Sequence, residues 1–537
     1  MLEEIDIPRE AQNAYSKIIE DETNNNEIAD AIGGNGFRIR QETPLQEFYA
    51  GQKIFITGGT GFLGKILIEK LLRSCPSVST IYLLVRPKKE KNIQNRMQEL
   101  FEDPIFQVLK DKLPKFGHKV IAIAGDCALE GLGLSSSDRE LLINEVSIIF
   151  HVAATVRFDE KLKTAVAINI QSTADILELG KEMQKLKSLI HVSTAYANCN
   201  HQKIEEKMYT YPIKSVDLLK LVECMPEEAI DQLTPTIISS WPNTYAFTKA
   251  MAEDYVRRRN KGLPIGIFRP AIVVSTANEP IPGWIDNLYG PTGVAAGVST
   301  GILRSLHCDS EVNANIVPVD LTVNALIASA WDVAMQKTRR DEDMLIYNFV
   351  SSADARLTWG EFCKTNVAYS DIYPPSNSFW YLSFTMNKHK LVHSAYTVLL
   401  HLLPALVVDT ASLCIGQKPK LLKVYQKVHK FTDVISHFCT REWTFTNGNV
   451  QSMWDRLDSK DQQIFRFNMK NFNWELYFET YLKGIRVYLF KDDLSTLEQS
   501  KKRWIRFYWM HQITKAVGSS VGIWILWRLL STIFTMT

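Results

Sequence analysis

The sequence lacks several features that would place it in common protein classes. Its eight cysteines are scattered without a C-x-x-C pair, so their spacing indicates neither a zinc site nor a disulfide framework. We expect them to be reduced thiols in a protein that faces the cytosol. The net charge is only +2 over 537 residues, which argues against nucleic acid as a partner. No metal site is predicted.

The N-terminal stretch lacks the pattern of a targeting signal. Residues 1–41 are polar and acidic, without the basic start and apolar core of a secretory peptide. We therefore expect a flexible polar arm over residues 1–44. The chain as a whole is 46% hydrophobic and 22% charged, which is ordinary for a globular protein and allows two domains.

A glycine-rich turn follows the apolar run Lys53–Ile56 and precedes an amphipathic helical pattern. Glycine permits a sharp turn and lets the backbone approach a pyrophosphate, and the N-terminus of the next helix offers free amides and a positive dipole end. The order of strand, glycines and helix predicts a dinucleotide site. Its predicted contacts are Thr57, Gly58, Gly59, Thr60, Gly61, Phe62, Leu63 and Gly64.

The turn after the next predicted strand indicates which dinucleotide binds. Residues 80–85 form an apolar run typical of a buried parallel strand, and Arg86 and Lys89 follow it. A fold that binds NAD usually carries an acid here for the ribose hydroxyls. Cations suit a 2′-phosphate instead, so we predict NADPH with Arg86 and Lys89 as contacts. The alternative is a solvated basic turn.

Two further segments indicate the chemistry. The predicted strand over residues 189–192 ends in Ser193 and Thr194, and Tyr245 and Lys249 lie four apart, on one helical face. A phenol is a poor acid at neutral pH until a nearby ammonium lowers its pKa, so we expect Lys249 to lower the pKa of Tyr245. These four residues are the predicted catalytic group, and the sequence leaves open which hydroxyl of Ser193 and Thr194 acts.

Taken together, these motifs resemble an extended short-chain dehydrogenase/reductase and, more narrowly, a fatty acyl-CoA reductase. The narrower resemblance also rests on residues 151–158, 191–200 and 282–287, and it spans about residues 45–490. It implies reduction of a long-chain acyl-CoA to a primary alcohol by two NADPH, with release of CoA and an enzyme-held aldehyde. No metal takes part in that reaction.

The resemblance also implies further cofactor contacts. Besides Tyr245 and Lys249, these are Asp126, Val152, Ala153, Ala154, Asn169, Arg269 and Pro270. From the residues alone, Asp126 could equally be a turn aspartate and Asn169 an amide on a helix surface.

Alternating strand and helix patterns over residues 53–320 predict an α/β protein with a doubly wound parallel sheet, the Rossmann arrangement of this family. We assign residues 45–355 to this reductase domain. A mainly helical pattern assigns residues 356–490 to a C-terminal domain. We expect its aromatic residues to pack in the core, and the weaker alternative is that some of them line an acyl tunnel. Residues 491–537 are predicted to be a basic and aromatic linker with a membrane segment.

Two apolar stretches raise the question of a membrane. Residues 394–416 are long enough to span, but His401, Pro404 and Asp409 interrupt them, so a span and a buried or membrane-resting hairpin both stay open. Residues 516–536 follow a basic and aromatic belt, which predicts a C-terminal anchor with the catalytic domain facing the cytosol. An interfacial amphipathic helix is the alternative. Membrane lipid is thus a predicted partner, at the endoplasmic reticulum or, alternatively, the peroxisome; a homo-oligomer is left open.

Two other functions fit part of the sequence. Another reductase or epimerase of the same fold, acting on a lipid, sterol or nucleotide sugar, would keep the glycines, Tyr245 and Lys249 but would not account for residues 282–287 or the C-terminal region. A non-catalytic NADPH-binding membrane protein would be expected to lack Tyr245 or Lys249. Both residues are present, which favours the acyl-CoA reductase.

Overall fold

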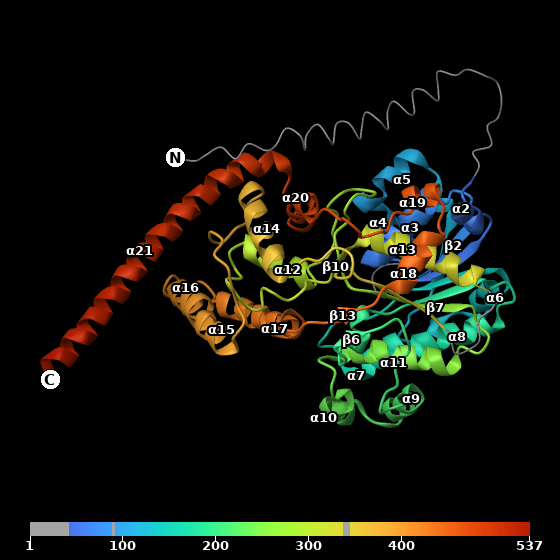
Figure 1. The fold of residues 1–537 in the computed structure, drawn as a ribbon, viewed down its shortest axis with the longest axis horizontal. Helices are drawn as coiled ribbons and strands as arrows, with labels where there is room; N and C mark the ends of the chain where they lie inside the picture. Colours follow the sequence, from blue (N-terminus) through green and yellow to red (C-terminus); the bar gives the residue numbers. More distant parts are fainter. Residues whose placement is uncertain (1–41, 88–91, 337–343, 537) are drawn as a thin grey trace, which may run out of the picture. The chain divides into compact units, whose positions relative to one another are not determined.

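The protein was analysed as a computed structural model that describes residues 42–87, 92–336 and 344–536. A seven-stranded parallel sheet with the strand order β11-β7-β5-β4-β1-β2-β3 lies at its centre (Figure 1). The strands are β1 Lys53–Thr57, β2 Thr80–Val85, β3 Val120–Ala124, β4 Ile148–His151, β5 Ser188–Val192, β7 Ile265–Pro270 and β11 Leu345–Phe349. The predicted doubly wound parallel sheet is therefore confirmed.

Helices cover both faces of this sheet, so its strands are apolar on both sides. Along β1, Ile54 and Ile56 belong to a core shared with α3 and α13, whereas Phe55 lies in a second core with α6 and α8. The elements around the sheet are α2 Pro44–Tyr49, α3 Phe62–Ser74, α4 Ile93–Glu102, α5 Gln107–Lys112, α6 Ser136–Glu145, α7 Leu162–Val166, η4 Ala167–Gln171, α8 Ser172–Glu182, α9 Ser215–Cys224, α10 Glu227–Ile238, α11 Thr244–Arg259 and α13 Val319–Met335.

The strand order reverses at β1, whose neighbours are β2 on one side and β4 on the other. Thr57 at the end of β1 lies opposite His151 at the end of β4. At such a reversal the loops after the two strands diverge and leave a crevice at the carboxyl edge of the sheet. The glycine-rich turn and the residues after β4 therefore meet at the place where this fold binds ligands.

The C-terminal region is mainly helical, as predicted. Its helices are α14 Trp359–Ile372, α15 Lys390–Thr397, η6 Val398–Leu402, α16 Leu403–Cys414, α17 Leu421–Cys439, α18 Gly448–Arg456, α19 Ser459–Ile464, α20 Trp474–Gly484, η7 Ile485–Leu489 and α21 Leu497–Met536. Helix α12 Gly290–Ser299 joins them, and three short parallel pairs, β8 Ile272–Val274 with β10 Ile316–Pro318, β9 Ser305–His307 with β12 Thr385–Asn387, and β6 Lys203–Ile204 with β13 Thr444–Phe445, complete the fold.

The cores on either side of residue 355 are built from interleaved segments. Residues 443–469 return to the sheet, where the Asn449 amide donates to the Ile346 carbonyl (2.8 Å) and Arg456 pairs with Asp332 of α13 (2.8 Å). Conversely, residues 274–316 supply apolar side chains to the core around α14 and α20. The boundary at residue 355 stays a prediction.

A turn around Gly283 joins the glycine-rich loop to the C-terminal helices. Gly283 has φ +76°, and a Cβ atom there would lie 2.2 Å from the Thr480 carbonyl oxygen of α20. The next residue, Trp284, stacks on Phe62 at the start of α3, with ring centroids 5.5 Å apart. This turn therefore needs glycine both for its conformation and for the close approach of α20.

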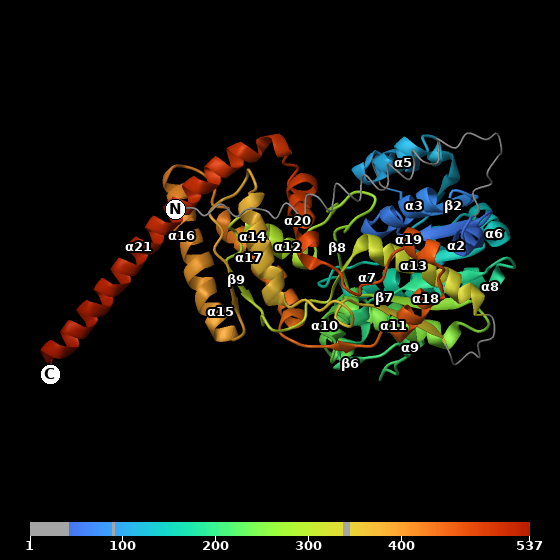
Figure 2. The same ribbon diagram turned by 45° about the horizontal axis from the view of Figure 1, so that its top comes forward.

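Two helical segments of the described chain are long and apolar enough to cross a membrane, Lys390–Cys414 and Leu494–Thr532. The first turns of α21 nevertheless pack on the helical region. The Trp504 indole donates to Asp371 (2.8 Å), and the Trp380 indole donates to His511 (3.1 Å). From Ile513 to Arg528 the side chains are exposed, and Figures 1 and 2 show this part of α21 running away from the other helices.

Substitution of Gly283 by alanine should destabilise the fold much more than the same change at Gly262. Both glycines have φ near +75°, but the Cβ position is crowded at Gly283 and open at Gly262. Gly262→Ala should lower the free energy of unfolding by about 1 to 2 kcal/mol from backbone strain alone. Gly283→Ala adds a steric term of about 1 to 3 kcal/mol. Chemical denaturation of the two variants measures the difference, and equal losses would contradict it.

Candidate active site

The glycine-rich turn is shaped for close approach of the backbone. Gly58 has φ +75°, and a Cβ atom there would lie 2.6 Å from the Ala153 nitrogen in the loop after β4. At Gly64 a Cβ atom would lie 2.4 Å from both the Gly58 oxygen and the Gly59 Cα. Helix α3 can therefore pack this closely against the turn only if residue 64 is glycine. Gly61, by contrast, is exposed and caps α3 without a side-chain hydrogen bond, which leaves the first amides of the helix free. These features fit the phosphates of a dinucleotide.

Thr57 is a predicted cofactor contact, but its side chain is buried in the protein. Its hydroxyl is buried, accepts the Ala153 N–H (3.2 Å) and lies 2.8 Å from His151 Nδ1. Burial lowers the pKa of His151 to about 3, so this imidazole is neutral. Thr57 therefore ties β1 to the chain after β4 and positions Gly58, and its hydroxyl has its partners within the protein.

Arg86 and Asp126 lie together at the carboxyl ends of the paired strands β2 and β3. The Arg86 Nε is 3.9 Å from an Asp126 carboxylate oxygen, and more than half of the arginine side chain is exposed. Both are thus open to a ligand at the edge beside the glycine-rich turn. Lys89 lies outside the described residues.

Asn169 fastens the loop after β4 to helix α11. It sits in η4, one turn of π-helix, a form that is frequent at functional sites. Its side-chain oxygen accepts the Thr155 N–H (3.0 Å), and its amide donates to the Thr248 hydroxyl (2.9 Å). Asn169 thereby positions Val152, Ala153 and Ala154 next to the helix that carries Tyr245, and its own contacts are with the protein.

The structure separates the two hydroxyl residues after β5. The Thr194 side chain faces Tyr245 and lowers the pKa of its hydroxyl, and it also accepts the Tyr196 N–H (3.2 Å). The Ser193 hydroxyl instead donates to Glu253 (2.6 Å), on the inner side of α11. The structure therefore favours Thr194 over Ser193 as the partner of Tyr245, and its catalytic role stays a prediction.

Tyr245 and Lys249 lie on one face of α11, held by the Asn243 side chain that caps the helix through the Ala246 N–H (2.8 Å). Burial raises the pKa of Tyr245 to about 12, and the hydrogen bond with Thr194 opposes that rise. Burial also lowers the pKa of Lys249 to about 8, while its ammonium donates to the Val192 carbonyl (2.7 Å). Lys249 is not among the groups that shift the pKa of Tyr245 in this structure, so the expectation that it lowers this pKa stays a prediction.

Arg269 corrects another prediction. We expected it at the cofactor, but its side chain is completely buried and pairs with Glu253 through two hydrogen bonds of 2.9 and 2.7 Å. Nη1 also donates to the Glu205 carbonyl and Nη2 to the Lys207 carbonyl (3.1 Å each). Four of its five N–H groups are thus held inside the protein, because a buried charge needs such partners. Pro270 is nearer the site, since its carbonyl lies 3.5 Å from the Thr194 hydroxyl.

The tyrosine also has aromatic neighbours that the sequence did not single out. The ring centroid of Phe158, in the loop after β4, lies 5.8 Å from that of Tyr245. The ring centroid of Phe438, at the end of α17, lies 5.8 Å from that of Phe158. Tyr196 and Trp443 complete the group around Phe438. Phe438 carried no local signal, because only the fold brings the C-terminal region to Tyr245. This group gives the site an apolar wall.

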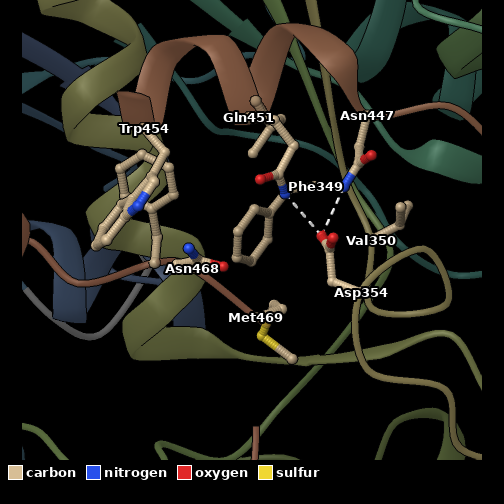
Figure 3. Close-up of a pocket in the computed structure, with 10 residues that line it drawn as sticks. Phe349, Val350, Asp354, Asn447, Gln451, Trp454, Asn468 and Met469 are labelled. Carbon is tan, nitrogen blue, oxygen red and sulfur yellow. Dashed lines mark hydrogen bonds between the residues drawn. The ribbon is translucent and has the colours of Figure 1, made fainter. Parts of the chain in front are cut away.

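A small cavity lies elsewhere, where β11 meets α18 (Figure 3). Its volume is about 10 Å³, room for a single water molecule at most. The Asn447 and Gln451 amides donate to Asp354 at its edge (2.7 and 2.8 Å). Its size and its distance in the fold from Tyr245 make it a packing defect and not a substrate site.

The sheet order, the open glycine-rich turn and the Tyr245–Lys249 face define an oxidoreductase of the extended short-chain dehydrogenase/reductase class that uses a nicotinamide cofactor. Two family models, both described as "Male sterility protein", match residues 56–326 and 400–492. The chain belongs to the fatty acyl-CoA reductase family.

Relatives from several animals support this membership. The chain is 44% identical over 492 residues to "Fatty acyl-CoA reductase wat" of Drosophila melanogaster, covering 92% of this chain and 94% of that one. It is 35% identical over 458 residues to "Fatty acyl-CoA reductase 1" of Xenopus laevis, covering 85% and 88%. It is 33% identical over 486 residues to "Fatty acyl-CoA reductase 2" of Homo sapiens, covering 90% and 93%.

Solved structures share the fold at lower identity. The reductase domain of a nonribosomal peptide synthetase from Mycobacterium tuberculosis matches with a TM-score of 0.55 at 17% identity, covering 82% of this chain and 92% of that one. The terminal reductase domain of the myxalamid pathway matches with a TM-score of 0.52 at 19% identity, covering 82% and 91%.

Ser193 and Thr194 should respond differently to loss of their hydroxyls. Thr194→Val removes the hydroxyl that faces Tyr245 and should lower reductase turnover about a hundredfold, as for loss of one donor at a reacting oxygen. Ser193→Ala removes a donor to buried Glu253, so it should lower the free energy of unfolding by about 1 to 3 kcal/mol and leave turnover within about tenfold. Steady-state kinetics and denaturation of both variants test this, and the reverse pattern would assign the role to Ser193.

Proposed function

We propose that the protein reduces long-chain fatty acyl-CoA to a primary fatty alcohol with NADPH, releasing CoA and passing through an aldehyde. The observation that carries this proposal is the grouping of Tyr245, Thr194 and Lys249 at the carboxyl edge of the sheet, next to the glycine-rich turn. The substrate class comes from relatives named fatty acyl-CoA reductases, which match over most of the chain.

In the proposed reaction Tyr245 and Thr194 act on the oxygen of the thioester carbonyl. Their hydroxyls donate hydrogen bonds to this oxygen as negative charge develops on it, and Tyr245 then supplies the proton. NADPH, when bound, supplies the hydride for each of two reductions. The first reduction gives a hemithioacetal, whose C–S bond breaks as its hydroxyl proton passes to the sulfur, so that CoA leaves as the thiol and an aldehyde remains. The same hydroxyls serve the aldehyde in the second reduction, where Tyr245 protonates the oxygen to give the alcohol.

Lys249 is proposed to hold the cofactor ribose and to assist Tyr245. Its ammonium already donates to the Val192 carbonyl at the end of β5, which holds the side chain against the sheet. With the pKa of Lys249 lowered to about 8, the side chain is charged at neutral pH and loses its charge in mildly alkaline solution. A charged Lys249 is the form that donates to ribose oxygens.

The choice of NADPH over NADH is proposed from Arg86. Its guanidinium lies at the end of β2, where a ribose would be placed, and it is largely exposed beside Asp126. A guanidinium can bind a 2′-phosphate through two parallel hydrogen bonds. The glycine-rich turn and the open N-terminus of α3 would hold the pyrophosphate.

We further propose that α21 anchors the enzyme in an intracellular membrane, the endoplasmic reticulum first and the peroxisome as the alternative. The side chains of Val517, Ile523, Trp524, Leu526 and Trp527 are exposed. The basic residues between Lys501 and Lys515 precede this segment, which favours a cytosolic catalytic region.

Tyr245→Phe should lower alcohol formation by about a hundredfold or more while NADPH binding stays near normal, because the change removes the general acid and keeps the ring. Tyr255→Phe is the matched control on the same helix and should keep wild-type turnover. Turnover with acyl-CoA and cofactor titration measure the two effects. A Tyr245→Phe enzyme that keeps more than about a tenth of the wild-type rate would remove Tyr245 from the mechanism.

Arg86→Ala should raise the KM for NADPH and leave the KM for NADH nearly unchanged. A charge-assisted contact with a phosphate is worth about 1.5 to 3 kcal/mol, which corresponds to about a tenfold to hundredfold change. Initial rates with the two cofactors, which act as internal controls for each other, measure it. Equal effects on both cofactors would show that Arg86 is a surface turn residue.

Truncation after Lys515 should leave the protein bound to membranes only peripherally, so that a high-salt wash releases it, and should keep it folded. The cut removes the exposed apolar part of α21 but keeps Trp504 and His511, which pack on the helical region. Membrane fractionation with a high-salt wash measures release, and cofactor binding checks the fold. If the truncated protein still sediments with membranes after the wash, an element upstream of Lys515 is sufficient to hold it there.

A further inference from the structure

The segment from α15 to α16 is one continuous helical rod with two different faces. In Figure 2 it runs vertically beside α17. His401, Ala405 and Asp409 follow one another at intervals of four, and all three are buried against the domain. A spacing of four places them on one side of a helix.

The buried side of the rod is fixed by polar contacts. The Asp409 carboxylate accepts the N–H groups of Lys420, Leu421 and Leu422 (3.0, 2.9 and 2.9 Å) and so caps the N-terminus of α17. His401 accepts the Arg304 N–H at Nε2 (3.0 Å) and lies 3.1 Å from His429 at Nδ1. A helix crossing a bilayer would have to lose these partners or drag them into hydrocarbon, where unpaired polar groups are costly.

The opposite side of the rod is apolar and open to solvent. Its members are more than half exposed: Leu399, Leu403, Leu406, Val407 and Leu413. A row of large aliphatic side chains with this exposure marks an interaction surface.

Charge identifies the partner of this face. Between Lys390 and Lys427 the sequence has five lysines and a single acidic residue, Asp409, whose carboxylate is turned into the domain. Lys390 is the first residue of the rod, and Lys418, Lys420 and Lys423 follow it, all exposed. An apolar helical face bordered by cations suits the interface of a bilayer that contains anionic lipid.

We propose that the exposed face of α15–α16 lies in the plane of such a bilayer, at the level of the head groups, and that this segment does not span it. The rod is then a second membrane contact in addition to α21. Its position bears on the active site because α17, which Asp409 caps, carries Phe438 at its other end beside the Tyr245 group. When the rod is docked on the bilayer, α17 would therefore keep the aromatic group around Phe438 at a fixed distance from the lipid.

A topology experiment on the full chain separates docking from spanning. In a background that lacks the exposed native thiols (Cys224→Ser, Cys414→Ser), single cysteines are placed at the two ends of the rod, His389→Cys and Gln417→Cys. Lys364→Cys on α14 is the matched exposed control. In intact microsomes, a membrane-impermeant maleimide should label all three without detergent. Protection of one end only, lost on adding detergent, would overturn the proposal in favour of a span.

Depth quenching then tests contact with lipid. Full-length protein with a fluorophore on Val407→Cys is reconstituted in phosphatidylcholine–phosphatidylserine vesicles that contain nitroxide lipids. Fluorescence should be lost with shallow nitroxides and much less with deep ones, and the Lys364→Cys control should show no loss in either. Vesicles without phosphatidylserine should give weaker quenching. Absence of quenching at Val407, with both ends of the rod labelled, would overturn the proposal and assign this face to a protein partner or to solvent.

Discussion

The buried ion pair between Glu253 and Arg269 is the interaction on which the active site depends. Glu253 lies eight residues after Tyr245 and four after Lys249, so all three share one face of α11. Arg269 holds this carboxylate from β7, Ser193 holds it directly after β5, and Asn198 holds it from the short helical turn Ala195–Asn198 that follows. A buried charge that loses its partner costs about 3 to 5 kcal/mol, so the helix cannot rotate or slide cheaply. The pair thereby fixes where Tyr245 and Lys249 meet the sheet.

The same packing explains why the predicted site residues divide into two groups, those that are open to a ligand and those that hold the first group in place. Gly58 and Gly61 leave the glycine-rich turn without side chains, and Arg86 presents an exposed cation, at the carboxyl edge of the sheet. Thr57, Asn169 and Arg269 use their polar groups on partners inside the protein and hold the first group in place. A family motif therefore contains residues that contact a ligand and residues that position them, and the letters alone do not distinguish the two.

The C-terminal region contributes residues to the active site in addition to forming helices of its own. Phe438 reaches the aromatic group at Tyr245 from one end of α17, while Asp409 caps the other end. Gly283 and Trp284 connect α20 to the start of α3 beside the glycine-rich turn. Packed elements thus link the cofactor edge, the catalytic helix and the apolar α15–α16 rod. We therefore expect the three parts to act as one functional unit.

The sequence by itself determined the parallel α/β fold, the glycine-rich turn and the pairing of Tyr245 with Lys249, because these depend on local patterns of apolar residues, glycine and helical spacing. It could not decide between Ser193 and Thr194, which are adjacent and chemically alike, or show that Arg269 turns inward. Nor could it place Phe438 at the site or distinguish the two sides of α15–α16. Those outcomes depend on which distant side chains share a buried charge or a hydrogen bond, and only tertiary packing brings Glu253 to Arg269, Phe438 to Phe158 and Asp409 to the start of α17.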